Sequence, residues 1–323
     1  VGKSGQVVRV TLDLEDYVIS SDIIRIRLKQ SSTAEGLVAY LNSESGQYAL
    51  EAIKIGILNR ISINDVKELQ IPLNYKDMSL NKVDLSEGIK EANKLYKECL
   101  EIFKNFIIQK DNLFDIPQMI FTEPCKIEPE RLDSKYYTYL GSKLYKFTHS
   151  NSNNITWQPL REIVEIKKAI RPNIDENKEI NYINISNIDD DLSIIISNEK
   201  DLFKNLSSRI RYVLKENEII TAKSGSATGT ENHVTAIVTR KYKDMMASDA
   251  FYNIKPIGAD PYYLLFLFKQ AIILKQIEAG STGLYFKTIS RNEFEEISIP
   301  RLDPLVEEEI SKKMKTYVEL LQK

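Results

Sequence analysis

Residues 85–106 read LSEGIKEANKLYKECLEIFKNF, and their apolar side chains recur at alternating steps of four and three residues. This a/d heptad spacing puts the apolar side chains in one stripe, with Lys and Glu on the other faces, as in a coiled-coil helix. We therefore predict a spacer helix within residues 80–117, reaching about 42 Å if it extends to Leu113 at ~1.5 Å per residue. The residues predicted to pack in this stripe are Leu85, Ile89, Ala92, Tyr96, Cys99, Phe103 and Phe106.

A second apolar stripe follows Pro304 and predicts a C-terminal spacer helix within residues 302–323. Its first turn carries Glu and its later turns carry Lys, which is the order that the helix dipole favours. Either helix could instead be an ordinary amphipathic helix packed on its own domain. We favour the interpretation that the two helices pack against each other, because each of them follows the same kind of segment. The packing residues predicted here are Ile310, Met314, Tyr317 and Leu321.

The segments before the two helices are similar to each other in sequence. The matching segments are 3–5 with 223–225, 61–64 with 289–292, and 71–72 with 299–300. We predict that residues 1–79 are the C-terminal part of one α+β domain and that residues 118–301 are a complete second copy. Alternating and β-branched runs within the second copy predict strands in a curved or barrel-like sheet with helices on its flank. The predicted strands are 180–188, 192–196, 219–222 and 234–239, and the predicted helix is 260–279.

Composition excludes several classes of protein. The chain has 323 residues with 44 Lys and Arg against 46 Asp and Glu, so it is not basic throughout. No apolar run approaches the ~18 residues of a membrane span, which predicts a soluble protein. The two thiols, Cys99 and Cys125, exclude a disulfide framework and favour a reducing compartment, the cytoplasm. Because the chain begins with Val1, we expect it to be a piece of a longer polypeptide.

Catalytic and metal-binding motifs are weak. The segment Gly2-Lys3-Ser4 ends like a phosphate-binding loop, but the upstream glycine has no place in the sequence. Residues 260–263, DPYY, resemble the D-P-P-Y motif of amino-DNA methyltransferases but lack the second Pro, and a capped helix start explains them. The acidic run 189–191 reads as a turn, and His149 and His233 have no metal-ligand spacing. We predict no catalytic residue, no metal site and no cofactor in this chain.

Positive charge is concentrated in residues 200–243, which hold nine Lys and Arg against four Asp and Glu, a net charge of +5 in a chain of −2. Such a basic face suits phosphate contacts, and nearby polar side chains can reach base edges. The phosphate candidates are Lys204, Arg209, Arg211, Arg240 and Lys241. The base-edge candidates are Lys223, Ser224, Ser226, Thr228, Asn232, Ser281, Thr282, Tyr285 and Lys287. The corresponding positions of the first copy are Lys3, Ser4, Asn59 and Arg60.

Five segments together resemble the DNA-specificity (S) subunit of Type I restriction-modification systems. They are RLDSKYY at 131–137, WQPLREI at 157–163, YINISNI at 182–188, EIITAKSG at 218–225 and ISRNEFEEISIP at 289–300. The resemblance implies two target recognition domains joined by long helices that form an antiparallel coiled coil. The first domain departs from the family pattern because it lacks its front half, including any counterpart of the RLD residues at 131–133.

The same resemblance implies a function in DNA recognition without chemistry. Each recognition domain would grip one half of a bipartite double-stranded site, and the coiled coil would set the gap between the halves. Two adenine methyltransferase subunits that use S-adenosylmethionine and ATP-driven restriction subunits would be the partners. Two alternatives remain open: the C-terminal specificity region of a single-chain adenine methyltransferase or restriction-methylation fusion, and a coiled-coil scaffold whose repeats bind protein.

Overall fold

The computed structural model describes residues 7, 23–28, 34–54, 61–72, 75, 85–107, 134–150, 155–206 and 209–322. The chain divides into two compact units, residues 1–86 and residues 87–323, each with a hydrophobic core. Several predictions lie outside the described residues: the sites at Lys3, Ser4, Asn59 and Arg60, and the motif residues 131–133.

The described part of the first unit contains the helices α1 (Ala34–Asn42), α2 (Glu44–Ala52) and α3 (Ile63–Lys67). Its core is built by the buried side chains of α1 and α2, because each helix turns an apolar face toward the other. These core residues are Leu37, Tyr40, Leu41 and Leu50.

The second unit mixes helices and strands, which confirms the mixed character of the predicted fold class. Its helices are α4 (Leu85–Ile107), α5 (Ser134–Leu140), α6 (Lys143–Thr148), α7 (Leu160–Ile163), α8 (Phe203–Leu206), α9 (Pro261–Leu267), α10 (Ala271–Gly280), α11 (Arg291–Glu295) and α12 (Pro304–Leu321). Its strands are β1 (Thr156–Pro159), β2 (Val164–Ile166), β3 (Glu179–Ile183), β4 (Ile188–Asp189), β5 (Ile194–Ile195), β6 (Glu199–Leu202), β7 (Ile210–Val213), β8 (Ile219–Ala222), β9 (Ser224–Gly225), β10 (Thr235–Ile237), β11 (Met246–Ser248), β12 (Phe251–Pro256), β13 (Ser281–Thr282), β14 (Lys287–Ile289) and β15 (Ser298–Arg301).

The strands form small, separate sheets. Two of the sheets have four strands, in the orders β10-β8-β12-β2 and β6-β3-β11-β7. A third has the order β13-β14-β9, and β1-β15 and β4-β5 are two-stranded. The prediction of a barrel-like sheet is wrong for the described residues, because β10 and β2 are unpaired edges of one four-stranded sheet and β6 and β7 of the other. The acidic run 189–191 enters the turn between β4 and β5, as predicted.

The single helix predicted over 260–279 is two helices, α9 and α10. Asp260 caps α9 as predicted, because its side chain accepts the backbone N–H groups of Tyr262 and Tyr263. The break falls at Gln270, whose backbone is extended at φ −83 and ψ 138. Its side-chain amide donates to the Phe266 carbonyl at 2.9 Å, and the Lys269 N–H donates to the same carbonyl at 3.1 Å.

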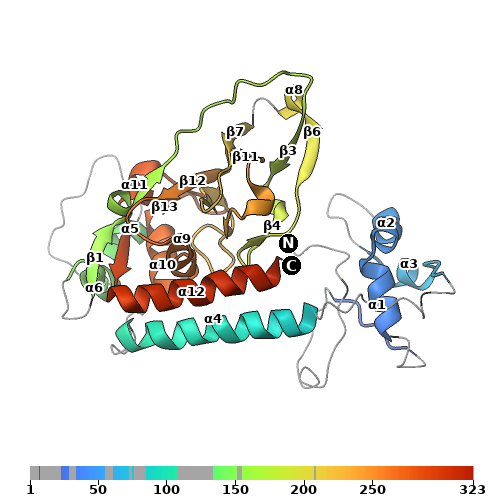
Figure 1. Ribbon diagram of the computed structural model, residues 1–323, viewed down its shortest axis with the longest axis horizontal. Helices are drawn as coiled ribbons and strands as arrows, with labels where there is room; N and C mark the ends of the chain where they lie inside the picture. Colours follow the sequence, from blue (N-terminus) through green and yellow to red (C-terminus); the bar gives the residue numbers. More distant parts are fainter. Residues whose placement is uncertain are drawn as a thin grey trace. The chain divides into compact units, whose positions relative to one another are not determined.

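The helices α4 and α12 lie side by side and run antiparallel (Figure 1). Four contacts establish the direction, because residue numbers rise along α4 as they fall along α12. The paired residues are Gly88 with Leu320, Tyr96 with Tyr317, Glu98 with Lys313, and Cys99 with Ile310. The described α4 has 23 residues, a length of about 33 Å at ~1.5 Å rise per residue.

The predicted stripes of both helices face the interior for most of their length. Ala92, Cys99, Phe103, Ile310, Met314 and Tyr317 are buried, and Tyr96, Phe106 and Leu321 are partly buried. Ile89 is 36% exposed, and nothing is described of the Leu85 side chain.

The pair also packs against a third helix. The α12 helix lies on α9. From α9, the Phe266 ring reaches the rings of Tyr96 and Phe103 in edge-on contacts at 5.9 and 5.3 Å between centroids. The two long helices therefore pair with each other, and both also pack on α9 of the second copy, which is the domain that α12 follows.

The sequence repeat corresponds to a repeated local structure. In α3, the Ser62 side chain accepts the N–H of Asp65, and in α11 the Ser290 side chain accepts the N–H of Glu293. Both helices have five residues, and each ends at a Glu with φ and ψ near −86 and −2. In each copy, the Ser-capped helix comes after two consecutive helices and before a long helix in chain order. The two copies therefore share this local structure.

Candidate nucleic-acid interface

The sheet β13-β14-β9 brings together two groups of predicted base-edge residues that are about sixty positions apart in the sequence. Lys287 of β14 lies opposite Gly225 of β9, and Thr288 lies opposite Ser224. On the other side of β14, Thr282 also pairs with Thr288. The segments 223–228 and 281–287 therefore form one loop cluster, as expected for a single contact surface.

The residues of this loop cluster differ in solvent exposure. Ser226, Asn232, Thr282 and Tyr285 are exposed, and Ser224 is half-buried. Thr228 and Ser281 are buried, and the Ser281 hydroxyl donates to the Ile277 carbonyl at 2.6 Å. The two lysines of the cluster take part in ion pairs, Lys223 with Asp249 at 2.9 Å and Lys287 with Glu278 at 2.9 Å. The polar groups at the surface of the cluster are thus mainly hydroxyls and amides.

The buried His233 holds the loop between β9 and β10 in place. Its Nδ1 accepts the N–H of Gly229 at 3.2 Å, so its proton lies on Nε2, which is 2.8 Å from the Thr221 hydroxyl. Gly229 has φ +75, and a side chain there would collide with the backbone of Glu278 in α10. Burial lowers the pKa of His233 from 6.5 to about 4.

The unfolding free energy is expected to fall as the pH drops from 6.5 to 4. In this window the unfolded chain protonates His233 and the folded chain does not, so the full contribution is present above pH 6.5. The loss is at most about 3 kcal/mol, from ~1.4 kcal/mol per pKa unit. Urea unfolding at pH 7.5 and pH 4.5 measures it. His233→Gln should lose less stability on acidification than the wild type, and an equal loss in the two proteins would contradict this assignment.

Three predicted phosphate-binding residues belong to the α8 to β7 region, beside the loop cluster. The Arg209 carbonyl accepts the N–H of Asp249 at 2.8 Å, and Asp249 pairs with Lys223, so Arg209 lies next to the cluster. Arg209 is exposed, and Arg211 follows it in β7 with its guanidinium donating to the Ile210 carbonyl. Lys204 is exposed on α8, with Nζ 3.4 Å from the Asn177 side chain.

Arg240 and Lys241 lie apart from this group. They follow β10, and Ile237 at the end of β10 pairs with Ile219 at the start of β8. Lys223 lies beyond the opposite end of β8, so the two groups are separated by at least the four residues of that strand, about 13 Å at ~3.3 Å per residue. The basic face expected from the composition is therefore divided into two.

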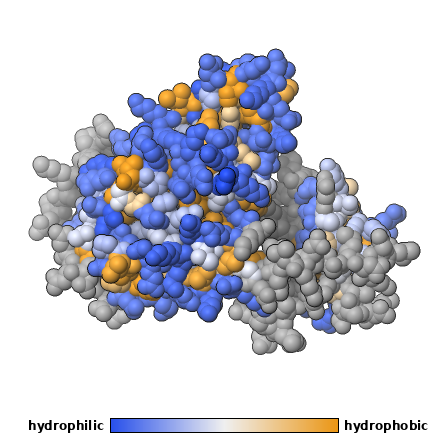
Figure 2. Space-filling model, in the orientation of Figure 1, coloured by the Kyte–Doolittle hydropathy of each residue, from blue (hydrophilic) through white to orange (hydrophobic). Residues whose placement is uncertain are grey.

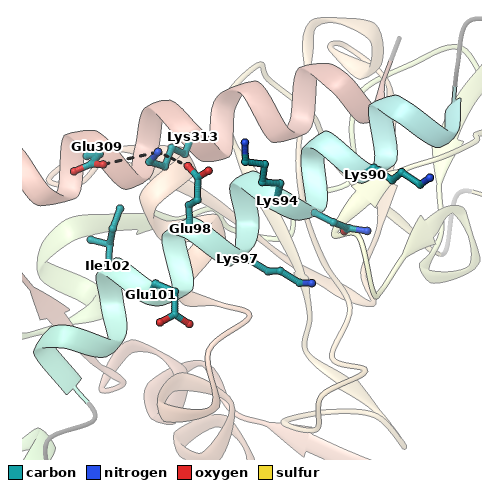
Figure 3. Close-up of a pocket in the computed structure, with 9 residues that line it drawn as sticks. Lys90, Lys94, Lys97, Glu98, Glu101, Ile102, Glu309 and Lys313 are labelled. Carbon is teal, nitrogen blue, oxygen red and sulfur yellow. Dashed lines mark hydrogen bonds and ion pairs between the residues drawn. The ribbon is translucent and has the colours of Figure 1, made fainter. Parts of the chain in front are cut away.

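A further charged surface lies on the outer side of the α4 and α12 pair (Figure 3). Lys313 of α12 forms an ion pair with Glu98 of α4 at 2.6 Å, and this contact lowers the pKa of Glu98. Lys90, Lys94 and Lys97 recur at steps of four and three, so they form one exposed row on α4 beside this pair. The full lining is Lys90, Asn93, Lys94, Lys97, Glu98, Glu101, Ile102, Glu309 and Lys313.

Sequence reasoning missed two kinds of exposed residue. The heptad pattern places Lys90, Lys94 and Lys97 on the polar side of the helix but does not separate this row from the other polar residues of α4. Leu284 and Phe286, which flank the predicted Tyr285, were passed over although they are 71% and 67% exposed. The available signal was a run of three large apolar residues directly after Gly283 in a segment of polar residues.

Within the described ranges, no three His, Cys, Asp or Glu side chains gather into a group that could hold a metal ion. Among those same residues, none of the helices is long and apolar enough to cross a membrane.

Comparison with known proteins gives matches among solved structures alone. No family model matches the sequence, and no curated protein matches it. A chain from a structure of the type I R-M system matches 53% of this chain and 44% of its own length, with 24% identity and a TM-score of 0.45. The HsdS subunit from Thermoanaerobacter tengcongensis matches 54% and 44%, with 19% identity and a TM-score of 0.42.

A third match is the Type-I restriction-modification S subunit from M. genitalium, which covers 90% of this chain and 67% of its own, with 12% identity and a TM-score of 0.37. The matched region spans less than half the length of the first two structures. The chain is thus similar to the class of protein that its sequence motifs resemble, the specificity subunits of Type I restriction-modification systems.

Proposed function

We propose that this chain reads a bipartite DNA sequence for a Type I restriction-modification system. The observation that carries the proposal is the repeated module followed by a long helix. A Ser-capped helix precedes α4 in one copy and α12 in the other, and the two long helices pack antiparallel. A protein with two similar modules and one paired helical connector suits a DNA site with two halves and a gap.

The second module offers the groups that a DNA contact needs. Arg209 and Arg211 lie beside Lys223 of the loop cluster, and we assign the two arginines to phosphates because positive side chains fix the position of a protein on the duplex. Ser226, Asn232 and Thr282 present exposed hydroxyl and amide groups beside them, and we assign these to base edges in the major groove. Arg240 and Lys241 would contact phosphates at a second point.

The helix pair would serve as the spacer of the DNA site. The described α4 is about 33 Å long at ~1.5 Å per residue, close to one turn of DNA at ~34 Å. The outer row of Lys90, Lys94 and Lys97 is available to partners. The partners would be the adenine methyltransferase subunits, which use S-adenosylmethionine, and the ATP-driven restriction subunits. This chain would supply sequence recognition and no catalysis.

Substituting Arg209→Ala with Arg211→Ala is expected to weaken binding to duplex DNA of any sequence. Loss of two phosphate contacts should reduce the steepness of log affinity against log salt by about two units, at ~0.9 per contact. Gel shifts of random duplex across a salt series measure both quantities. Lys312→Ala with Lys315→Ala, two exposed lysines of α12, is the matched control and should bind as the wild type does.

Two outcomes would count against the proposal. A loss confined to one DNA sequence would show that the two arginines read bases and do not contact phosphates. A wild type that binds no duplex even at low salt would favour the protein-binding scaffold over DNA recognition.

A further inference from the structure

The hairpin between β13 and β14 ends in three consecutive large apolar side chains that project into solvent. Leu284, Tyr285 and Phe286 are 71%, 85% and 67% exposed. The view in Figure 2 shows a largely hydrophilic surface with small, scattered hydrophobic patches. Burying an apolar side chain of this size stabilises a protein by about 1.5–3 kcal/mol, and each of these three exposed side chains lacks that stabilisation. A cluster of this kind marks a binding surface more often than a chance exposure.

The base of this hairpin is firmly attached to the core. Lys287 of β14 pairs with the half-buried Glu278 of α10, and the Lys287 side chain is 13% exposed. Ile289, at the end of β14, is buried, and its carbonyl accepts the Tyr252 hydroxyl at 2.9 Å. The strands of the hairpin are thus held on two sides, and the tip projects from a fixed base.

The turn itself is also constrained. Gly283 has φ +98, and an added side chain would overlap the carbonyl oxygen of Phe286. Only glycine adopts this conformation at low cost, so the residue before the tip is specialised for a tight turn. The three apolar side chains are therefore displayed on a narrow ribbon of two strands.

The surroundings of the tip are polar. Thr282 and Thr288 at the base of the hairpin are exposed, and across β14 the strand β9 leads to the exposed Ser226. Lys223, which directly precedes β9, lies at the same sheet. Exposed hydroxyl groups thus lie at the base of the apolar tip, and Lys223 lies farther along the sheet, opposite Ile289. Apolar side chains set among polar groups are typical of proteins that insert a wedge between base steps.

The size of the tip distinguishes between two kinds of partner. Three large side chains offer at most about 600 Å² at ~200 Å² each, below the ~800 Å² that each side of a stable protein interface buries. One base step needs no more than this area, and base stacking on an aromatic ring is worth about 1–3 kcal/mol per base. Duplex DNA is therefore the partner that the tip fits.

We propose that Leu284, Tyr285 and Phe286 form a wedge that inserts between base pairs of bound DNA and partly unstacks them. The inference rests on the proposed function, because it requires the chain to bind duplex. Tyr285, predicted from the sequence to contact a base edge, would instead stack on a base face. Partial unstacking would also ease access of a partner methyltransferase to an adenine, because that chemistry requires the base to leave the stack.

Unwinding of a closed circular plasmid tests the wedge without knowledge of the target sequence. The full chain is bound to the plasmid at low salt, topoisomerase relaxes the DNA, and the linking number is measured after the protein is removed. The wild type should shift the mean linking number in proportion to bound protein. The variant with Leu284→Ser, Tyr285→Ser and Phe286→Ser should lose most of this shift while still retarding the plasmid in a gel. Tyr285→Phe should retain the shift.

The control variant is Leu305→Ser with Ile257→Ser, which removes two exposed apolar side chains from elsewhere in the second unit and should retain the full shift. If the wild type binds but leaves the linking number unchanged, or if the triple Ser variant keeps the shift, the wedge is overturned and DNA recognition stands. If the wild type does not bind the plasmid, the proposed function and the wedge are both overturned.

Discussion

Phe266→Ala is expected to lower the free energy of unfolding by about 3–5 kcal/mol, because it removes a fully buried ring and leaves a cavity. The ring joins α9 to α4 through edge-on contacts with Tyr96 and Phe103, and such contacts add about 0.5–1.5 kcal/mol each beyond the area buried. We therefore expect the substitution to loosen α4 as well as to reduce global stability. Urea unfolding followed by circular dichroism measures the first effect, and hydrogen exchange of α4 amides measures the second.

The matched control for this prediction is Phe286→Ala, which removes the same side chain at a position that is 67% exposed. It should change the unfolding free energy by less than about 0.5 kcal/mol. If the two substitutions cost the same, or if the α4 amides of Phe266→Ala stay as protected as those of the wild type, Phe266 does not secure the helix pair.

A matched insertion of one heptad into both long helices is expected to move the DNA target. Because Tyr96 lies beside Tyr317 and Glu98 pairs with Lys313, seven residues placed after Lys97 in α4 correspond to seven placed after Lys315 in α12. The insertion keeps the apolar stripes facing each other and lengthens the pair by about 10 Å at ~1.5 Å per residue. The gap between the two half-sites should grow by about three base pairs at ~3.4 Å each, and methylation of the original site should be lost.

Methylome sequencing of a host that carries the intact system measures the gap. A two-residue insertion at the same two points is the control, since it turns each stripe by about 200° at ~100° per residue and should abolish methylation. Methylation of the original site after the heptad insertion would overturn the spacer role of the helix pair, whether or not the chain binds DNA.

Much of the architecture was predictable because its causes are local. The steps of four and three from Ala92 to Phe103 predict a helix with one apolar stripe, and the described helix has it. Asp260 was predictable as a helix cap because the carboxylate needs only the two amides that follow it. The break at Gln270 was missed, because an unbroken apolar pattern does not reveal that a polar side chain will bond back to the helix end.

The candidate site was predictable in composition and less so in arrangement. The segments 223–228 and 281–287 were both singled out for their side chains, and their pairing through β9 and β14 is a long-range contact that short-range patterns do not encode. Net charge predicted one basic face, whereas the antiparallel pairing of β8 and β10 carries Arg240 to the opposite end from Lys223. The number of charged residues in a segment does not show at which end of a sheet each of them lies.

Periodicity and capping residues predicted the two long helices, because both signals depend on residues within a few turns of the chain. The internal repeat predicted the similarity of the modules before these helices, because it is a direct identity of sequence. Tertiary packing alone decided that Cys99 contacts Ile310 in an antiparallel pair and that α4 packs on Phe266. Tertiary packing also decided the exposure of Tyr285 at the hairpin tip, because exposure depends on which side chains the rest of the chain leaves uncovered. The burial of a side chain and its contacts depend on which distant segments pack into the same core, and local sequence patterns do not contain that information.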